Sequence, residues 1–130
     1  MSIYSVKHYN LGVLQRAKSV ALEIYHLTNS FPKHELYGLT SQMRKAGTSI
    51  GANIFEGEAF ATTFPSRRRN HLFNAVGSVN ETRFDLEFSH ELGYVDTEMF
   101  ERLDSELVEV SKMLYGLIRK VEGDIRKHSA

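Results

Sequence analysis

The C-terminal third of the chain carries the most regular pattern, in which apolar side chains recur every three or four residues over about three heptads. The members of this repeat are Phe100, Leu103, Leu107, Val110, Leu114, Leu117 and Val121. On an α-helix this spacing forms one apolar line, which is typical of helices that pack lengthwise against one another. Such a helix is stable only when its apolar line is covered, so the rest of the chain is expected to supply partner helices.

Three earlier segments show helical periodicity, and Pro32 and Pro65 both fall in the connections between them. No useful length of the sequence alternates apolar and polar residues as a half-buried strand would. We therefore predict an all-α fold, an up-down-up-down antiparallel four-helix bundle that forms a single domain over residues 1–130. The predicted helices lie at approximately 11–29, 40–60, 66–92 and 97–122.

Residues near the predicted helix ends favour particular caps. Short polar side chains precede three of the periodic segments, where they can accept a hydrogen bond from the first turn. The candidate N-caps are Thr40, Ser66, and Asp96 or Thr97. Gly93 follows the third segment, at the position where a left-handed residue commonly ends a helix. The chain after Glu122 is expected to fray.

The composition excludes several kinds of site. The chain has no cysteine, so disulfides and thiolate metal ligands are absent, and no apolar run approaches the roughly 18 residues of a membrane span. We expect a cytoplasmic protein that does not enter a membrane.

The net charge is zero, but residues 1–83 hold ten Lys/Arg against five Asp/Glu, while residues 84–130 hold six against eleven. This distribution permits a basic surface on a neutral protein, although ordinary solvated faces would also produce it.

The predicted helix at 66–92 is apolar on two sides. One side carries Leu72, Val76, Val79 and Leu86, and the other carries Phe73, Phe84 and Phe88. The core of one small bundle cannot use both sides of a helix, so the excess apolar surface predicts an interface between protomers. We expect a homo-oligomer.

The predicted helix at 40–60 combines an apolar stripe with a polar edge. The stripe consists of Leu39, Met43, Ala46, Ile50, Ile54 and Gly57, and the polar edge beside it of Gln42, Lys45, Ser49, Asn53 and Glu56. A merely solvated face would not usually gather its polar groups on one edge. We expect these groups to join the helix to a neighbouring helix, with Lys45 contacting Glu81, or to line a surface shared between protomers.

A four-helix bundle raises the possibility of a di-metal carboxylate site, which uses Glu-x-x-His motifs. Two such motifs occur, Glu23 with His26 and Glu87 with His90. The remaining carboxylates would come from Glu56, Glu106 or Glu109. Glu23 and His26 project away from the apolar arc of their helix, so we predict no metal site, no cofactor and no enzyme. Glu87 is expected to form a structural ion pair with Arg83.

Basic residues make nucleic acid the better-motivated partner. Arg67, Arg68 and Arg69 open a predicted helix, where the positive end of the helix dipole disfavours cations, so these side chains are expected to meet an anionic partner or simply solvent. Further candidate contacts are Arg44, Lys45, Arg16, Lys18 and Lys7. No helix-turn-helix and no aromatic platform for bases is recognisable, so binding would be directed to the nucleic-acid backbone and would depend steeply on salt.

The segment QMRKAGTSIGANIFEG, residues 42–57, resembles the bacterial four-helix-bundle protein family that is encoded by intervening sequences within 23S ribosomal RNA genes. The motif of that family reads approximately Q-x-x-R-A-x-x-S-I-P-x-N-I-x-E-G. The matching residues are Gln42, Ala46, Ser49, Ile50, Asn53, Ile54, Glu56 and Gly57. Lys45 stands where arginine is usual, and Gly51 stands where proline is usual. The resemblance extends through FPKHELYGLTSQ, through Gly77, Ser78 and Glu81, and through the LGY turn at 92–94.

The resemblance implies a ring-like homo-oligomer, a pentamer, and it is shared with the accessory proteins of diversity-generating retroelements, which work with a reverse transcriptase. The resulting hypothesis is a non-enzymatic oligomer that binds structured RNA through a basic surface. A second hypothesis is an interaction scaffold or accessory subunit for a polymerase-type protein, with nucleic acid contacted only indirectly. The di-metal carboxylate enzyme is the remote alternative.

Overall fold

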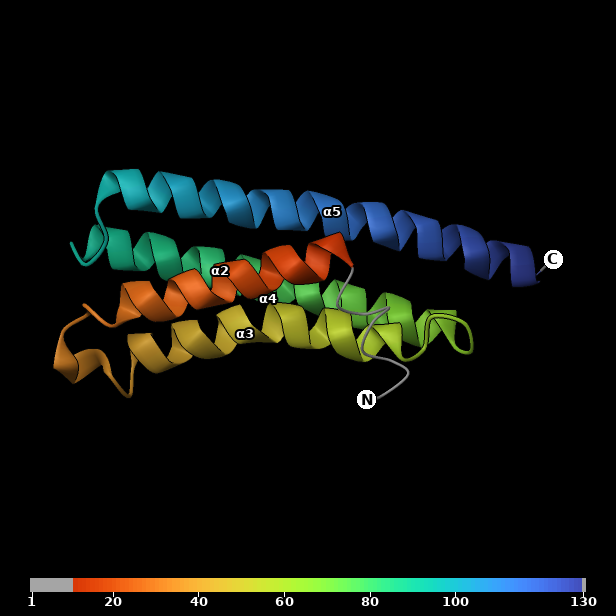
Figure 1. Cartoon of the computed structure of the whole chain (residues 1–130), viewed down its shortest axis with the longest axis horizontal. Coiled ribbons are helices and arrows are strands. Elements are labelled where there is room, and N and C mark those ends of the chain that lie inside the picture. Colours follow the sequence, from red (N-terminus) through yellow and green to blue (C-terminus); the bar gives the residue numbers. More distant parts are fainter. Residues whose placement is uncertain (1–10, 130) are drawn as a thin grey trace.

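The computed structural model describes residues 11–129, which fold into four α-helices joined by short connections. The helices are α2 (Gly12–Thr28), α3 (Leu39–Glu58), α4 (Pro65–Glu91) and α5 (Thr97–Ser129), and a short 3-10 helix, η1 (Lys33–Glu35), lies between α2 and α3. Consecutive helices run in opposite directions (Figure 1), so the fold is the predicted all-α, up-down-up-down bundle. The described residues contain no β-strand, and none of their helices is long and apolar enough to cross a membrane.

The core is built from one apolar stripe on each helix. On α3 the predicted stripe is correct, because every member from Leu39 to Gly57 is buried. On α4 the predicted division is also correct: Leu72, Val79 and their neighbours on that side are buried, whereas the three phenylalanines on the other side are 45–65% exposed. The heptad line of α5 packs into this core through Leu103, Leu107, Val110, Leu114 and Val121. Burial of these stripes is the main contribution to the stability of the bundle.

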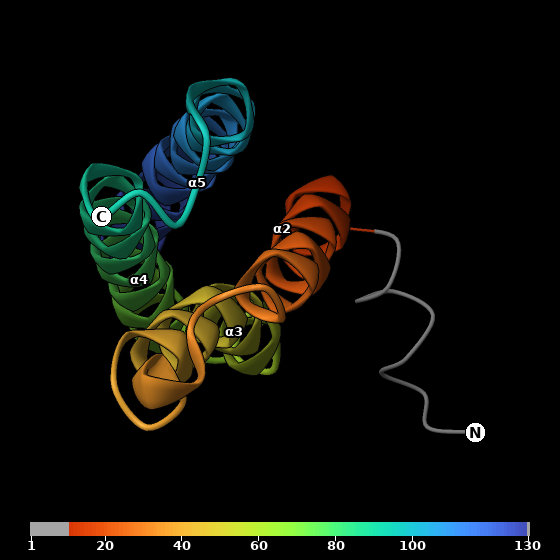
Figure 2. The same ribbon diagram turned by 90° about the vertical axis from the view of Figure 1, so that its left-hand side faces the viewer.

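The helices lie in chain order around the bundle axis. Viewed end-on, α3 lies between α2 and α4, and α5 lies beside α4, while α2 and α5 are farther apart (Figure 2). Ion pairs join these two more distant helices across their seam, through Arg102 with Glu23 and Arg16 with Glu106. The packing between α3 and α4 and between α4 and α5 is more extensive than the packing between α2 and α5.

The turn between α4 and α5 shows the predicted glycine geometry. Gly93 has a positive φ of 84°, its N–H donates to the His90 carbonyl, and the Tyr94 N–H donates to the Ser89 carbonyl. This pair of bonds satisfies carbonyl groups that the end of a helix would otherwise leave open. Asp96 is the N-cap of α5, since its carboxylate accepts from the Met99 N–H at 2.8 Å.

Two predicted caps are wrong. α3 begins at Leu39 after Gly38 without a side-chain cap, and Thr40 is buried inside its first turn. α4 begins at Pro65 rather than after Ser66, because proline has a preset φ and lacks the N–H that the first helical position leaves unused.

The predicted end of the fourth helix is also wrong, because α5 continues to Ser129 rather than ending near Glu122. Val121 is almost completely buried and Ile125 packs against the core, so the apolar line extends beyond residue 122. The other helix ends lie within two residues of the predicted positions.

Candidate nucleic-acid interface

The arginine triplet at the start of α4 does not form one surface. Successive residues on an α-helix are rotated by about 100°, so three in a row must point in three directions. Arg68 points into the bundle, Arg67 lies over the rings of Phe60 and Phe64, and Arg69 is half-buried. The sequence-based view of the three arginines as one patch is therefore wrong in its geometry.

Arg68 forms an internal ion pair. Its guanidinium donates to the Glu58 carboxylate at the end of α3, and the two side chains are only 13% and 8% exposed. The Nε atom of Arg68 is buried and has no hydrogen-bond partner among the described residues. An arginine held in this way ties the end of α3 to the start of α4, and its charge is already neutralised.

Arg44 is likewise engaged within the chain. Its guanidinium lies 4.6 Å from the centre of the Tyr25 ring and donates to the Thr28 hydroxyl at 2.8 Å and to the Asn29 side-chain oxygen at 3.0 Å. These contacts fasten α3 to the end of α2. Gly57 lies beside Arg68, and Arg44 is thirteen residues before Gly57 on α3, so Arg44 is about 20 Å away from Arg68 along the helix.

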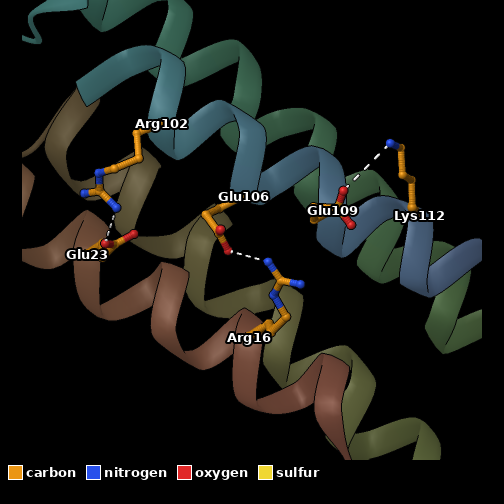
Figure 3. Close-up of polar contacts among 6 residues, drawn as sticks. All are labelled: Arg16, Glu23, Arg102, Glu106, Glu109 and Lys112. Carbon is orange, nitrogen blue, oxygen red and sulfur yellow. Dashed lines mark hydrogen bonds and ion pairs between the residues drawn. The ribbon is translucent and has the colours of Figure 1, made fainter. Parts of the chain in front are cut away.

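The two α2 candidates occupy a third region. Arg16 pairs with Glu106 of α5 at 2.9 Å, next to the pair of Glu23 and Arg102 (Figure 3). Lys18 is exposed on a different side of α2 and lines a groove between α2 and α3. Lys7 lies outside the described residues. The predicted basic residues thus belong to separate regions of the molecule.

Charge is instead separated along the length of the α4–α5 pair. Residues 65–78 and 111–127 hold eight Lys/Arg and two acidic residues, whereas residues 79–110 hold two Lys/Arg and ten acidic residues. Arg83 forms a two-point contact with Asp104, at 2.8 and 3.2 Å, and this contact fixes the register of the two antiparallel helices. One end of the pair is therefore strongly basic and the other strongly acidic.

The register brings the start of α4 level with the C-terminal half of α5. Arg67 is sixteen residues before Arg83 and Lys120 is sixteen residues after Asp104, so the two lie at about the same height in the bundle. The start of α4 and the C-terminal half of α5 accordingly lie at the same end (Figure 1). We call the following set the basic end: Arg67, Arg69, Arg119, Lys120, Arg126 and Lys127. In the part of the chain that the structure describes, no carboxylate lies within 4.0 Å of a cationic group of this set.

Sequence reasoning missed the four members of the basic end that α5 contributes. The signal was present, because the segment 97–127 is acidic in its first half and basic in its second. Pairing that segment antiparallel with 66–92 would have placed its basic half beside the arginine triplet. Of the residues at this end of the bundle, only the triplet was predicted as a contact.

The polar edge of α3 lies against α4. The Gln42 amide donates to the Asp85 carboxylate at 2.6 Å, and the Asn53 side-chain oxygen lies 3.4 Å from Nδ1 of His71. Glu56 approaches the same His71 nitrogen at 3.7 Å. Ser49 instead donates to the Lys45 carbonyl within its own helix. These contacts place the edge at the seam between two helices of one chain.

The expected contact between Lys45 and Glu81 is absent from the described ion pairs, although both residues line one shallow hollow at this seam. Gln42 makes the cross-helix contact that was expected of Lys45, because its shorter side chain faces Asp85 directly. Asp85 was not recognised from the sequence, since an aspartate in a periodic segment is ordinarily exposed.

Asp85 is the one fully buried acidic side chain among the described residues. Its Oδ1 accepts from Gln42, whereas its Oδ2 is buried without a hydrogen-bond partner. Burial raises the pKa of the Asp85 carboxyl, the hydrogen bond from Gln42 opposes this shift, and the nearby Glu81 charge adds to it. The polar seam between α3 and α4 therefore contains a carboxyl group that prefers its protonated form more than an exposed aspartate does.

This burial predicts a pH-dependent stability. Above the ordinary pKa of 3.8, the unfolded chain releases the Asp85 proton that the folded chain retains, so rising pH favours unfolding until the raised pKa is passed. As the pH rises from the ordinary pKa to the raised pKa of Asp85, the free energy of unfolding of the wild type is expected to fall relative to that of Asp85→Asn. The expected fall is up to about 1.4 kcal/mol per pH unit. Urea unfolding of both proteins between pH 4 and 7 measures the difference. A difference that does not change with pH would contradict the assignment.

The residues of the considered metal motifs are separated. Glu23 pairs with Arg102 across the α2–α5 seam at 2.7 Å, and His26 is exposed. Glu87 is exposed, and the expected pair with Arg83 is wrong because Arg83 reaches Asp104 instead. Among the described residues no group of three or more histidine and acidic side chains is placed to hold a metal ion.

Comparison with known proteins places this geometry in a family. A family profile described as 23S rRNA-intervening sequence protein matches residues 9–116. The 1.70 Å crystal structure of a protein with unknown function from the S23 ribosomal protein family of Bacteroides thetaiotaomicron VPI-5482 is similar, with a TM-score of 0.72 and 28% identity over 82% of this chain and 97% of that chain. No curated protein matches the chain. Because the profile covers most of the sequence, the chain belongs to the 23S rRNA-intervening sequence protein family.

Proposed function

We propose that this protein is a non-enzymatic, cytoplasmic RNA-binding protein that contacts the RNA backbone through its basic end. The observation that carries the proposal is the charge separation along α4 and α5, which leaves six cationic side chains at one end without a carboxylate partner in the described chain. Cationic groups without internal partners can neutralise phosphates and release the counterions that phosphates hold. The family is named for 23S rRNA intervening sequences, so structured RNA is the nucleic acid to test first.

The acidic end supports a defined orientation of the RNA. Ten acidic residues at 79–110 repel phosphates, while the basic end attracts them. A polyanion would therefore approach one end of the bundle and avoid the other. Arg68, Arg44 and Arg16 are left out of the proposed surface, because each is bound within the chain.

The salt dependence of binding tests the proposal. In the variant Arg69→Ala/Arg119→Ala/Lys120→Ala, the slope of log affinity against log salt concentration is expected to fall by about 2–3, because each lost phosphate contact removes about 0.7–0.9. Affinity for a labelled RNA hairpin should fall at least about tenfold at physiological salt. Fluorescence anisotropy titrations at several salt concentrations provide both values.

The control removes charge at the opposite end through Lys33→Ala/Lys45→Ala, at two exposed lysines. This variant should keep the wild-type slope to within about one unit. Equal losses in both variants would show that net charge, rather than the basic end, determines binding. Absence of salt-dependent binding by the wild-type oligomer would refute the proposed function.

We further propose that the protein assembles as a ring-like homo-oligomer, a pentamer. Support comes from the exposed outer face of α4, with Phe73, Phe84 and Phe88, and from a groove of about 550 Å³ between α2 and α3. The groove is lined by small and apolar residues that include Ala17, Ala21, Gly51 and Ala52. Two different surfaces that fit each other produce a head-to-tail contact, and such a contact closes into a ring when its rotation permits.

The mass in solution tests the assembly. A pentamer of the 14.8 kDa chain has a mass of about 74 kDa, five times that of the monomer. Light scattering should give this value at micromolar concentration. The mass of a single 14.8 kDa chain would contradict the assembly. The exposed phenylalanines of α4 would then be expected to contact a different protein. In that case, recovery of a polymerase-type partner after nuclease treatment would favour the scaffold hypothesis.

A further inference from the structure

Aromatic side chains gather at the connection between α3 and α4, which lies at the same end of the bundle as the basic end (Figure 1). We call Phe60, Phe64, Arg67 and His71 the aromatic corner. The Phe60 ring lies parallel to the His71 ring, with centres 5.9 Å apart and an interplanar angle of 8°, and it meets the Phe64 ring edge-on at 6.3 Å. No aromatic platform for bases was recognised in the sequence, because these rings come together only through the packing of α3 against α4.

The backbone around Phe64 is fixed. The Phe64 N–H donates to the Phe60 carbonyl at 3.0 Å, and the Phe64 carbonyl accepts from the N–H groups of Arg67 and Arg68. Pro65 follows directly and begins α4 with a preset φ. The Phe64 side chain is nonetheless 55% exposed, so a rigid backbone presents an aromatic ring to solvent.

One cationic group, that of Arg67, lies against this ring. The Arg67 guanidinium carbon lies 5.1 Å from the Phe64 ring centre and 5.5 Å from that of Phe60. Arg69 is two residues further on and is rotated by about 200° from Arg67, so it points to the other side of α4. With Arg119 and Lys120 of α5 it belongs to the rest of the basic end, at the same height of the bundle. Two carboxylates at the end of α3 are engaged elsewhere, that of Glu58 with Arg68 and that of Glu56 with His71.

We propose that the aromatic corner binds unpaired nucleotides of RNA, with one base stacked on Phe64 and a flanking phosphate contacted by Arg67. This inference rests on the proposed RNA binding and specifies which part of an RNA is recognised. Aromatic rings next to a cationic groove are the combination that single-stranded nucleic acids require, because every base has a face that can stack. A base inside a regular duplex has no free face, so loops, bulges and ends are the recognised features.

The test compares single-stranded and paired RNA. The probe is a single-stranded RNA of about 12 nucleotides that carries one 2-aminopurine, and the same strand paired with its complement is the second probe. Phe64→Leu keeps apolar volume against Phe60 but removes the π face, and Phe64→Trp restores a face. Tyr37→Leu is the matched control, since Tyr37 is also an exposed aromatic residue but lies before the start of α3, at the opposite end of the bundle.

Phe64→Leu is expected to weaken single-strand binding about tenfold and to leave duplex binding unchanged, because one stacked base is lost. The wild type and Phe64→Trp should quench the 2-aminopurine fluorescence on binding, whereas Phe64→Leu should not. Tyr37→Leu should behave as the wild type. Thermal unfolding of each variant establishes that the fold is kept.

The outcomes separate the two proposals. If Phe64→Leu binds the single strand as tightly as the wild type, or weakens both probes equally, stacking is overturned. RNA binding through the basic end stands in that case, provided that Arg69→Ala/Arg119→Ala/Lys120→Ala still weakens both probes. If the wild type binds neither probe at any salt concentration, both proposals fail.

Discussion

Replacement of Glu58 by glutamine is expected to lower the free energy of unfolding by about 3 kcal/mol. The substitution keeps the shape of the side chain but removes the charge that faces the Arg68 guanidinium, where both side chains are nearly inaccessible to water. An unpaired charge in such a place is costly, and the Nε atom of Arg68 already lacks a partner among the described residues. Equilibrium unfolding in urea measures the loss.

Two variants control this prediction. Glu109→Gln removes an exposed partner of Lys112, at 3.8 Å, and should change stability by less than about 0.5 kcal/mol (Figure 3). Glu58→Met/Arg68→Met removes both charges and should recover much of the loss, because the cost comes from the unpaired charge. If Glu58→Gln is as stable as the wild type, Arg68 is not held as an internal ion pair and belongs again among the candidate RNA contacts.

Substitution of Gly57 by alanine is expected to destabilise the protein by about 1–2 kcal/mol, although alanine is the better helix former. A Cβ atom at this position would lie 2.9 Å from the His71 Cβ and 3.5 Å from the Arg68 carbonyl oxygen. Both belong to the rigid first turns of α4, so the two helices would have to separate. The closest approach of α3 and α4 would be lost, and with it the seam that contains Asn53 and Gln42.

Gly51→Ala is the matched control on the same helix. A Cβ atom there would meet Leu14 and Ala17 at 3.8 and 3.9 Å, which are ordinary contact distances. With space available, alanine should stabilise α3 by up to about 1 kcal/mol. Thermal unfolding of the two variants should therefore shift in opposite directions. A shift of the same sign and size in both would show that the helix interface does not require a glycine at position 57.

Much of the fold could be predicted from the sequence because it follows from local periodicity. The apolar stripe of α3 and the heptad line of α5 each indicate which side of the helix is buried in the core. Gly93 indicates where α4 ends. Helix ends without a periodic signal were harder to predict. Thr40 looks like a cap in the sequence, but the chain buries it and begins α3 one residue earlier.

The candidate site could be predicted only in part, because it depends on contacts between helices. Arg67, Arg68 and Arg69 are adjacent in sequence, yet the helix rotates them to three different environments. The buried position of Asp85 depends on Gln42, forty-three residues away. Contacts of this kind depend on how the helices are aligned against one another, which the sequence alone does not show.

The basic end illustrates the same limit at larger scale. Its α4 and α5 members are about fifty residues apart in sequence, and the packing of α4 against α5, with the contact of Arg83 and Asp104, sets them at the same height. The net charge of zero conceals this separation. Composition describes the whole molecule, whereas binding depends on one end of it.

Ultraviolet crosslinking in cells, followed by mass spectrometry of the RNA-bound peptides and sequencing of the RNA, tests the central claim most directly. The claim predicts crosslinks within residues 60–71 and 112–127, which contain the aromatic corner and the basic end. Structured RNA with unpaired bases should be recovered with them. Crosslinks concentrated in residues 79–110, or recovery of a protein partner without any RNA, would contradict it.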